Sequence, residues 1–505
     1  MRIGARESWS HKLTLFKDRM VGSCVDSNCG SATPKTGSRE LALVFWISIA
    51  TNFAGSVYAS IQARGLYSDG VAYLVGVYQD RWFLLFDTRT VVQLLRQAPV
   101  VFASRYTSAS LFECGQLFSF VMLILPWFFC LLCWFVLPKN QKQWIIFPLL
   151  AALAGFMATS VHAVGEAAIA TGYEWLILIV LLFRANTIPW TLLWIGIILP
   201  AFRLHEGTFT FLTVIVVAAV MAFRSARSRL QRALLGVGVL YLIGTIAYQI
   251  RWVIFPQFQH DRDAVVNGLL HGEFLYYDGH FNLQLINGLA ALLILTMLGV
   301  AWVREIGKPS KVASQVLMVT WVLFCIVSVT FATMVEQSFA PFAQLQARYY
   351  PPLVGTLLAS IMVGLLQYTP SSRFLTSSPV VFTILLLSAI QLVADLASTE
   401  RWNAFVADLR VRLSISQGLI PWETTLHTGD ARADINWQLI KIGWVVPYFS
   451  IVYAPNGVVR AIINSPIETK PLPFNPAEIK LLPPLQGIDY APYEKSLLEQ
   501  AQRNR

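Results

Sequence analysis

The sequence predicts an all-α polytopic membrane protein, with about eleven transmembrane helices and a small mixed α/β domain at its C-terminal end. Two observations support this fold class. Of the 505 residues, 56% are hydrophobic and only 13% are charged, whereas soluble domains carry about 25% charged residues. Apolar runs close to the length of about 20 residues that crosses a bilayer also recur along the chain.

Apolar runs locate the expected spans, and the polar segments divide the chain. Spans are expected at residues 41–63, 112–137, 144–163, 167–184, 188–203, 208–223, 231–254, 282–303, 313–333, 350–367 and 379–398. Residues 1–40 are polar and basic, with no apolar core of signal-peptide length. We therefore expect a cytoplasmic tail over 1–40, a membrane core over 41–400 and an extracytoplasmic C-terminal domain over 401–505.

Basic residues predict the orientation, because Lys and Arg concentrate in short cytoplasmic loops. With the N-terminus inside, the short inside loops hold eleven Lys or Arg, and the N-terminal tail holds seven more. The short outside loops hold three, namely Arg203, Arg262 and Arg348. The net charge of +10 therefore reflects topology. No basic stripe interleaved with aromatic residues is present, so no nucleic-acid partner is expected.

The predicted outer loop 64–111 contains two segments that are typical of surface helices. "AYLVGVYQDRWFLLF" and "VVQLLRQAPVVFA" are both too short to span, and the second has a polar face with Arg96 and Gln97. Helices of this kind lie in the membrane surface with one apolar side buried in lipid. Ordinary packing of a loop against helix ends explains the pattern equally well, so both interpretations stay open.

The chain changes character after residue 400. "RWNAFVADLRVRL" places five large apolar residues on one helical face, namely Trp402, Phe405, Val406, Leu409 and Leu413. "YFSIVYAPNGVVRAIIN" has the pattern of a β-hairpin with Asn456-Gly457 at its turn. Seven prolines between 466 and 492 predict an extended tail.

Ionisable residues are sparse in the predicted spans and gather in the predicted outer loops. Five span interiors contain no charged residue or histidine, namely 114–137, 208–223, 285–302, 313–333 and 350–367. This sparseness argues against an ion-coupled transporter, since ion pathways usually leave ionisable groups at mid-membrane depth. Asp69, by contrast, directly follows the first span.

This arrangement resembles the GT-C superfamily of membrane glycosyltransferases, which take a sugar from a polyprenyl phosphate carrier on the outer side of the membrane. The resembling features are the inside N-terminus, the first outer loop with Asp69 in "YSDGVAYL", the two surface helices after it, and "QARYYPP" at 346–352. The resemblance covers roughly residues 41–400. Many members carry two neighbouring acids in the first outer loop, whereas Asp69 stands alone here.

The resemblance implies an integral protein of a bacterial inner membrane, in contact with membrane lipids. Its donor would be a polyprenyl-phosphate-linked sugar, and its acceptor a glycan, a lipid or a protein. Asp69 would be the general base that takes the acceptor proton. Arg348, beside Tyr349, would bind the phosphate through its guanidinium fork. Tyr349 and three residues of the short outer loops would contact the substrate, namely Glu166, His205 and Glu206.

No cofactor is expected, although "HDRD" (260–263) and "HGEFLYYDGH" (271–280) are dense in possible divalent-metal ligands. Their spacing matches no closed zinc site. Two other functions stay open. One is an O-antigen ligase or polymerase, an outer-face enzyme whose catalytic groups usually lie in a large late loop. The other is a non-enzymatic transporter or scaffold.

Overall fold

The computed structural model shows a mostly helical protein with a small sheet. It describes residues 36–67, 69–157, 165–255, 343–368, 373–376, 378–421, 446–463, 485 and 487–503. Six helices in this part of the chain are long and apolar enough to cross a membrane, namely Arg39–Ile61, Leu111–Val136, Glu166–Phe183, Glu206–Ser225, Arg229–Ile254 and Val380–Ile415. Helices of this length and composition indicate an integral membrane protein.

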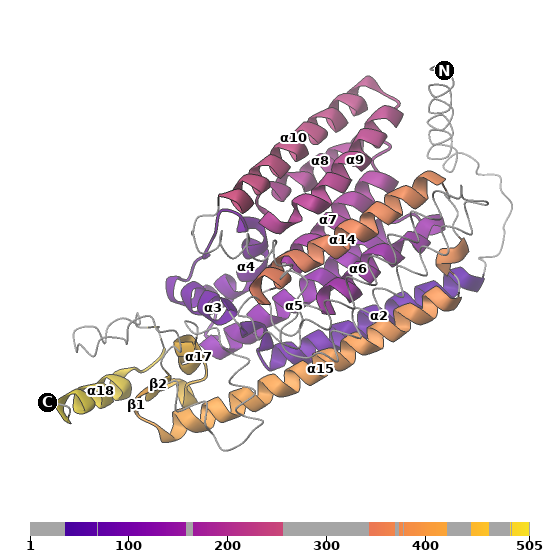
Figure 1. The fold of residues 1–505 in the computed structure, drawn as a ribbon. Helices are drawn as coiled ribbons and strands as arrows, with labels where there is room; N and C mark the ends of the chain where they lie inside the picture. Colours follow the sequence, from indigo (N-terminus) through magenta and orange to yellow (C-terminus); the bar gives the residue numbers. More distant parts are fainter. Residues whose placement is uncertain are drawn as a thin grey trace.

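The helices pack side by side into an elongated bundle (Figure 1). They are α2 (Thr36–Ile61), α5 (Leu111–Val136), α6 (Ile146–Met157), α7 (Glu166–Phe183), α8 (Ile188–Ile198), α9 (Phe209–Ser225), α10 (Arg229–Ile254), α14 (Ala343–Tyr368) and α15 (Ser378–Ile415). The helix α2 packs against α5 and α15, although α15 lies more than 300 residues later in the chain. The helix α14 packs against α6, α7 and α9, and α10 packs against α8 and α9.

Nine of the eleven predicted spans fall on these helices, and spans 282–303 and 313–333 lie outside the described residues. The helix in span 144–163 is described only as far as Met157. Spans 188–203 and 350–367 form apolar helical stretches of 10–17 residues. The helical membrane fold is therefore confirmed, whereas the total of about eleven spans stays a prediction.

Local sequence signals explain where two of the long helices begin. Before α5, the Ser110 hydroxyl accepts from the Glu113 backbone N–H at 3.2 Å, and the Glu113 carboxylate accepts from the Ser110 N–H at 2.7 Å. This reciprocal capping box satisfies two backbone donors that the helix leaves unpaired. Before α10, the Ser228 hydroxyl accepts from the Gln231 N–H at 3.0 Å in the same way.

The helix α15 continues through the predicted boundary at residue 400 without a break, since it runs from Ser378 to Ile415. Its 38 residues extend for about 57 Å, more than the bilayer core requires. The predicted apolar face is confirmed, because Trp402, Phe405, Val406, Leu409 and Leu413 are all buried. The C-terminal segment therefore begins on the same helix as the last predicted span.

The predicted β-hairpin at 448–464 is wrong. Residues Val446–Val452, the expected first strand, form helix α17. The strand β2 (Ala461–Ile463) pairs in parallel with β1 (Gly418–Ile420) instead. The Asn456-Gly457 turn is confirmed, with φ angles of 55° and 69°. A short apolar run does not distinguish helix from strand, and here burial of Phe449 against Trp402 and Phe405 accompanies the helix. Within the predicted proline-rich tail, Ala491–Arg503 form helix α18, which packs on β1.

One end of the bundle is covered by the loop 64–111 together with the C-terminal elements. The loop forms the short 3-10 helix η1 (Arg64–Leu66) and the helices α3 (Asp69–Asp80) and α4 (Thr90–Tyr106). Both α3 and α4 pack on α5, and α17 packs on α3 (Figure 1). The described parts of the two long segments expected outside thus lie at the same end of the protein. Which side of the membrane this end faces stays a prediction.

The turn that leads from η1 into α3 is closely packed. Ala63 has a left-handed backbone with φ 54°. A Cβ added to Gly65 would lie 2.7 Å from the Ser119 Cα, and a Cβ added to Gly70 would lie 2.4 Å from the carbonyl oxygen of Gly65. Only glycine therefore allows this turn to lie so close to α5 and to the start of α3.

Replacing Gly70 with Ala is expected to lower the free energy of unfolding by about 1–3 kcal/mol, because the new methyl group must push the backbone away from Gly65. Thermal unfolding in detergent micelles would measure this loss. Gly196→Ala on α8 is the matched control, since a Cβ there meets nothing within 4 Å. Helix propensity favours Ala at such a position by about 1 kcal/mol. Equal stability of the two variants would contradict the close packing at Gly70.

Candidate functional site

The helix α4 turns its polar side chains inward. Gln93, Arg96 and Gln97 are fully buried. The Gln97 side-chain amide bonds the N–H and the C=O of Leu84, at 2.8 and 2.9 Å, and the Gln93 oxygen accepts from the N–H of Phe86 at 2.6 Å. The two glutamines therefore hold the connection between α3 and α4 in place.

The opposite side of this region is apolar and exposed. Phe102 and Tyr106 are 61% and 70% exposed, and Leu94 and Leu95 are also on the surface. The guanidinium of Arg105 lies 4.7 Å from the ring centre of Trp82, which is exposed in the α3–α4 connection. Inward polar groups and outward apolar groups suit the boundary between lipid tails and headgroups. The structure thus favours the interpretation of α4 as a membrane-surface helix.

Arg89, the residue before α4, contacts two carboxylates that come from distant parts of the sequence. Its Nη1 donates to Glu166 Oε2 at 2.7 Å, its Nε donates to Glu206 Oε2 at 2.9 Å, and its Nη2 pairs with the other Glu206 oxygen. The contact with Glu206 is thus two-pronged, which is the stronger geometry for a guanidinium. Burial acts to lower the pKa of Arg89, but the carboxylates of Glu206 and Glu166 raise that pKa well above its ordinary value.

Arg96, two helical turns further along α4 than Arg89, is completely buried. Its guanidinium lies 4.9 Å from the ring centres of Tyr73 on α3 and Phe118 on α5. Its Nη2 is 2.8 Å from Glu166 Oε1, but the orientation forms no hydrogen bond. Among the described residues, no guanidinium nitrogen of Arg96 has a hydrogen-bond partner. Glu166 is therefore ion-paired with both arginines, and Arg96 keeps unused donors.

A short loop before α9 supplies the remaining members. His205 is buried, and its Nδ1 accepts from the N–H of Gly207 at 3.0 Å, which caps the 3-10 helix η4 (Glu206–Thr208). His205 also interacts electrostatically with Glu166. We call the set Arg89, Arg96, Glu166, His205 and Glu206 the charged cluster. It joins α4, α7 and η4 at the end of the bundle.

Three of the predicted substrate contacts, Glu166, His205 and Glu206, are thus brought together. Sequence reasoning missed the two arginines as members of this site. Arg89 and Arg96 stand seven residues apart with Gln93 between them, which places all three on one helical face. That spacing was the only sequence signal for the two arginines. It is equally consistent with a polar face that is buried and with one that is exposed to solvent.

The charged cluster can bind a polar ligand at its edge. The side chains of Arg89 and Glu206 are 14% and 12% exposed, whereas those of Arg96 and Glu166 are 0% and 2% exposed. Neither carboxylate is free to act as a base, because both are ion-paired. A paired carboxylate keeps further lone pairs for hydroxyl groups, and a guanidinium can bind an anionic oxygen. Sugar hydroxyls and phosphate are therefore the ligand chemistry that suits this edge.

Asp69 is the first residue of α3 and stands one helical turn before Tyr73. Residues four apart lie on the same helical face, so Asp69 shares the face of α3 that carries the Tyr73 ring over Arg96. The position of its side chain lies outside what the structure describes. The backbone alone puts Asp69 one turn from a residue that contacts the charged cluster.

Arg348 and Tyr349 lie in the first turns of α14, and their side chains also fall outside the described part of the structure. Gly355 packs on Thr171 of α7, and the Thr356 hydroxyl bonds that of Thr210 at 3.0 Å. The helix α14 also contacts η4. The first turns of α14 therefore approach the same end of the bundle as the charged cluster.

The segments 260–263 and 271–280 lie outside the described residues, so the possible metal ligands there stay a prediction. Within the described ranges, no group of three or more His, Cys, Asp or Glu residues could hold a metal ion.

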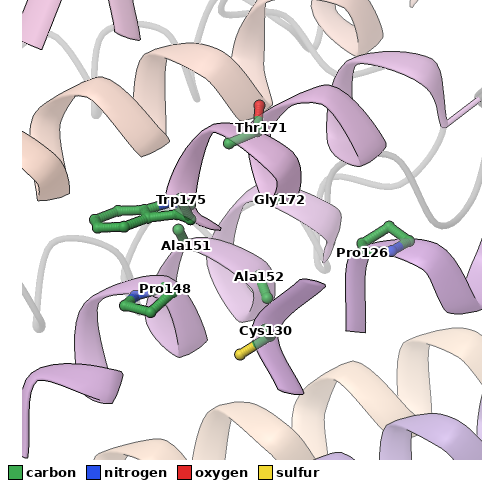
Figure 2. Close-up of a pocket in the computed structure, with 8 residues that line it drawn as sticks. All are labelled: Pro126, Cys130, Pro148, Ala151, Ala152, Thr171, Gly172 and Trp175. Carbon is green, nitrogen blue, oxygen red and sulfur yellow. The ribbon is translucent and has the colours of Figure 1, made fainter. Parts of the chain in front are cut away.

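A small pocket lies between α5, α6 and α7, well inside the bundle. Figure 2 shows its lining, which includes Pro126 and Cys130 of α5, Pro148 of α6, and Thr171 and Trp175 of α7. Its volume of about 10 Å³ is about that of one water position. This pocket is therefore too small for a sugar or a lipid tail.

Two buried carboxylates, Asp395 and Glu174, lie in the interiors of candidate spans, as exceptions to the sparseness of ionisable residues in the predicted spans. Asp395 on α15 is buried and accepts from Arg64 Nη2 at 2.9 Å, while Arg64 also donates to the Asp395 carbonyl at 2.7 Å and to Thr399 Oγ1 at 3.0 Å. Glu174 on α7 is fully buried. Asp395 is thus neutralised by an arginine, whereas Glu174 has no such partner among the described residues.

No family model, curated protein or solved structure matches this chain, so its function rests on the geometry and on the resemblance described above.

Proposed function

We propose that this protein is an integral membrane glycosyltransferase of the GT-C type, which moves a sugar from a polyprenyl phosphate donor to an acceptor on the extracytoplasmic face of a bacterial inner membrane. One observation carries the proposal. Asp69 opens α3 after the first span and the short helix η1, one turn before Tyr73, and Arg96 of the charged cluster lies over the Tyr73 ring. A candidate base thus stands beside a cluster suited to sugar hydroxyls and phosphate.

Asp69 would take the proton of the acceptor hydroxyl as that oxygen attacks the anomeric carbon. The bond between this carbon and the phosphate oxygen would break, and polyprenyl phosphate would leave with its charge held by a guanidinium. Arg348 is the residue that we propose for this contact, with Tyr349 beside it. Glu206 would contact the sugar at the exposed edge of the cluster, with His205 buried behind it, and Glu166 would hold the two arginines in place.

The outward apolar side of α4 supports the same proposal. Leu94, Leu95 and Phe102 are exposed there, so a polyprenyl tail in the membrane could lie against them while its phosphate stays at headgroup depth. This placement needs no deep cavity, and the pocket between α5, α6 and α7 is too small to serve as one.

The test is a transfer assay with the purified protein in lipid vesicles. Each of a panel of polyprenyl-phosphate sugars, labelled in the sugar, would be mixed with membrane glycan, lipid and protein acceptors. We expect labelled acceptor from at least one donor, and no transfer from the corresponding nucleotide sugars. Transfer of a preassembled oligosaccharide in place of a single sugar would favour the O-antigen ligase or polymerase alternative. Absence of transfer from every donor would contradict the proposal.

A transport function is the second candidate, because Glu174 is an ionisable group within a span. Such groups mark ion or proton pathways in many membrane proteins. Flux of a labelled donor across sealed vesicles without any transfer to acceptor would favour this reading.

The orientation can be tested separately. An enzyme reporter that is active only after export should be active when it is fused after Arg503 and inactive when it is inserted at Arg227, in the short loop between α9 and α10. The reason is the concentration of Lys and Arg in the loops predicted to be inside. The opposite pattern would place the charged cluster in the cytoplasm and would exclude an outer-face donor.

A further inference from the structure

Glu174 lies in the middle of α7 with no neutralising partner among the described residues. It is the ninth of 18 residues in this candidate span, about 12 Å from the start of the helix and thus near the middle of a bilayer core of about 30 Å. Its side chain is completely buried, and neither carboxyl oxygen forms a hydrogen bond within the described part of the chain. An ionised carboxylate in this position would be very costly.

The hydroxyl group beside Glu174 already donates its proton to another residue, so its oxygen faces Glu174 as a hydrogen-bond acceptor. Thr208 of η4 is its polar neighbour, but the Thr208 hydroxyl donates to the carbonyl of His205 at 2.9 Å. The Gln249 amide donates to the Ala201 carbonyl at 3.2 Å and to Thr208 Oγ1 at 3.4 Å, while its own oxygen has no partner among the described residues. Thr208 therefore presents a lone pair to Glu174. A carboxylic acid can donate a hydrogen bond to this oxygen, whereas a carboxylate would need the Thr208 hydroxyl to turn away from His205 and donate to it.

Within the described ranges, no cation pairs with Glu174 in place of that proton. The helices α6 and α8 carry no charged residue, and neither does the stretch 351–367 of α14. Tyr173 uses its hydroxyl proton on the carbonyl of Ile197 at 2.8 Å. On the packed elements, the other titratable groups besides the charged cluster at the start of α7 are Cys130 and Cys133 in α5 and groups near helix ends, namely Glu113, Cys114, Arg105, Tyr106, Arg224, Arg348, Tyr349, Tyr350 and Tyr368. The predicted spans 282–303 and 313–333 contain no Lys, Arg or His either.

We propose that Glu174 is a proton-binding site within the membrane layer and that the position of η4 depends on whether Glu174 is protonated. The ligand is a proton in preference to a metal ion, because Glu174, Thr208 and Gln249 supply too few oxygens for the six or more ligands of Ca²⁺ or the octahedron of Mg²⁺. Thr208 stands two residues from Glu206 on η4, and Glu206 holds Arg89. Loss of the proton would draw the Thr208 hydroxyl away from the His205 carbonyl and so loosen the segment that carries Glu206. This inference is independent of the proposed sugar transfer.

Dicyclohexylcarbodiimide, an apolar reagent that modifies protonated carboxyl groups inside membranes, would test the site. The full-length protein in lipid nanodiscs would be labelled across a series of pH values, and the label would be located by mass spectrometry. We expect label on Glu174 that falls to background as the pH rises. Glu174→Gln should lose this label, and Asp395→Asn, which changes the ion-paired carboxylate, should keep it.

Thr208→Val provides a second measurement that keeps the carboxyl group. Removing the hydroxyl that can donate to the carboxylate should favour the protonated form and shift the labelling curve to higher pH. Should Glu174→Gln fail to accumulate, the wild-type curve and the Thr208→Val curve decide the question by themselves. The proposal is overturned by absence of label on Glu174 at every pH, by a curve that Thr208→Val leaves unchanged, or by protection with sodium at constant pH, which would assign a metal cation in place of the proton.

Discussion

Replacing Asp69 with Asn is expected to lower the rate of sugar transfer by about 10²–10⁴-fold, because Asn cannot accept the proton of the acceptor hydroxyl. Its structural cost should be small. Asp69 is the first residue of α3, where a carboxylate stabilises the helix end by about 0.3–1 kcal/mol, and Asn is itself favourable near helix starts. Membrane insertion and thermal stability of the variant should therefore stay near wild type. Transfer from a polyprenyl phosphate donor, measured beside the unfolding temperature, separates the two effects.

Asp87→Asn is the matched control for this experiment. Asp87 lies in the same loop, its side chain is 69% exposed, and its partner Arg203 is 3.8 Å away and 45% exposed. Exposed pairs of this kind contribute about 0–1 kcal/mol, so Asp87→Asn should transfer within a few-fold of wild type. An Asp69→Asn variant as active as this control would remove Asp69 from the mechanism. The GT-C interpretation would then be weakened as a whole, because Glu206 and Glu166, the other candidate carboxylates, are both ion-paired.

Replacing Arg89 with Met is expected to lower the free energy of unfolding by about 3–5 kcal/mol, the cost of leaving buried charges without their partner. Both Glu166 and Glu206 would lose their bonds to the guanidinium, and Arg96 alone would remain beside Glu166. The contacts of α4 with α7 and with η4 would therefore both be weakened. Arg203→Met removes an exposed arginine of the same region, and it should change the stability by less than about 1 kcal/mol.

A rescue experiment separates lost charge balance from lost packing. Adding Glu206→Gln to Arg89→Met removes one of the two uncompensated carboxylates, so the double variant should recover part of the stability. Thermal unfolding of the four proteins in the same detergent gives the coupling energy directly. If Arg89→Met unfolds at the same temperature as Arg203→Met, the charged cluster is not what holds α4 on the bundle.

The amino-acid sequence by itself determined the membrane fold and the positions of most helices, because these depend on local properties. Apolar length predicts spans, and periodic apolar residues predict a buried face, as they do for Trp402 and Leu409 on α15. The turn at Asn456-Gly457 was also predictable, since its positive φ angles favour those two residue types. The clustering of the candidates Glu166, His205 and Glu206 at one end followed from the order of spans and loops.

The tertiary structure decided which groups pair across the fold. Arg89 meets Glu166 and Glu206 over 77 and 117 residues of chain, and Arg64 meets Asp395 over 331, distances at which no periodic pattern carries information. The same holds for the pairing of β2 with β1, in which Ala461 pairs with Gly418, 43 residues earlier in the chain. Because β2 pairs with β1, the predicted hairpin does not form. Glu174 lacks an ion partner among the described residues for the same reason. Whether a buried charge is neutralised depends on what packs against it, and packing is set by the whole fold.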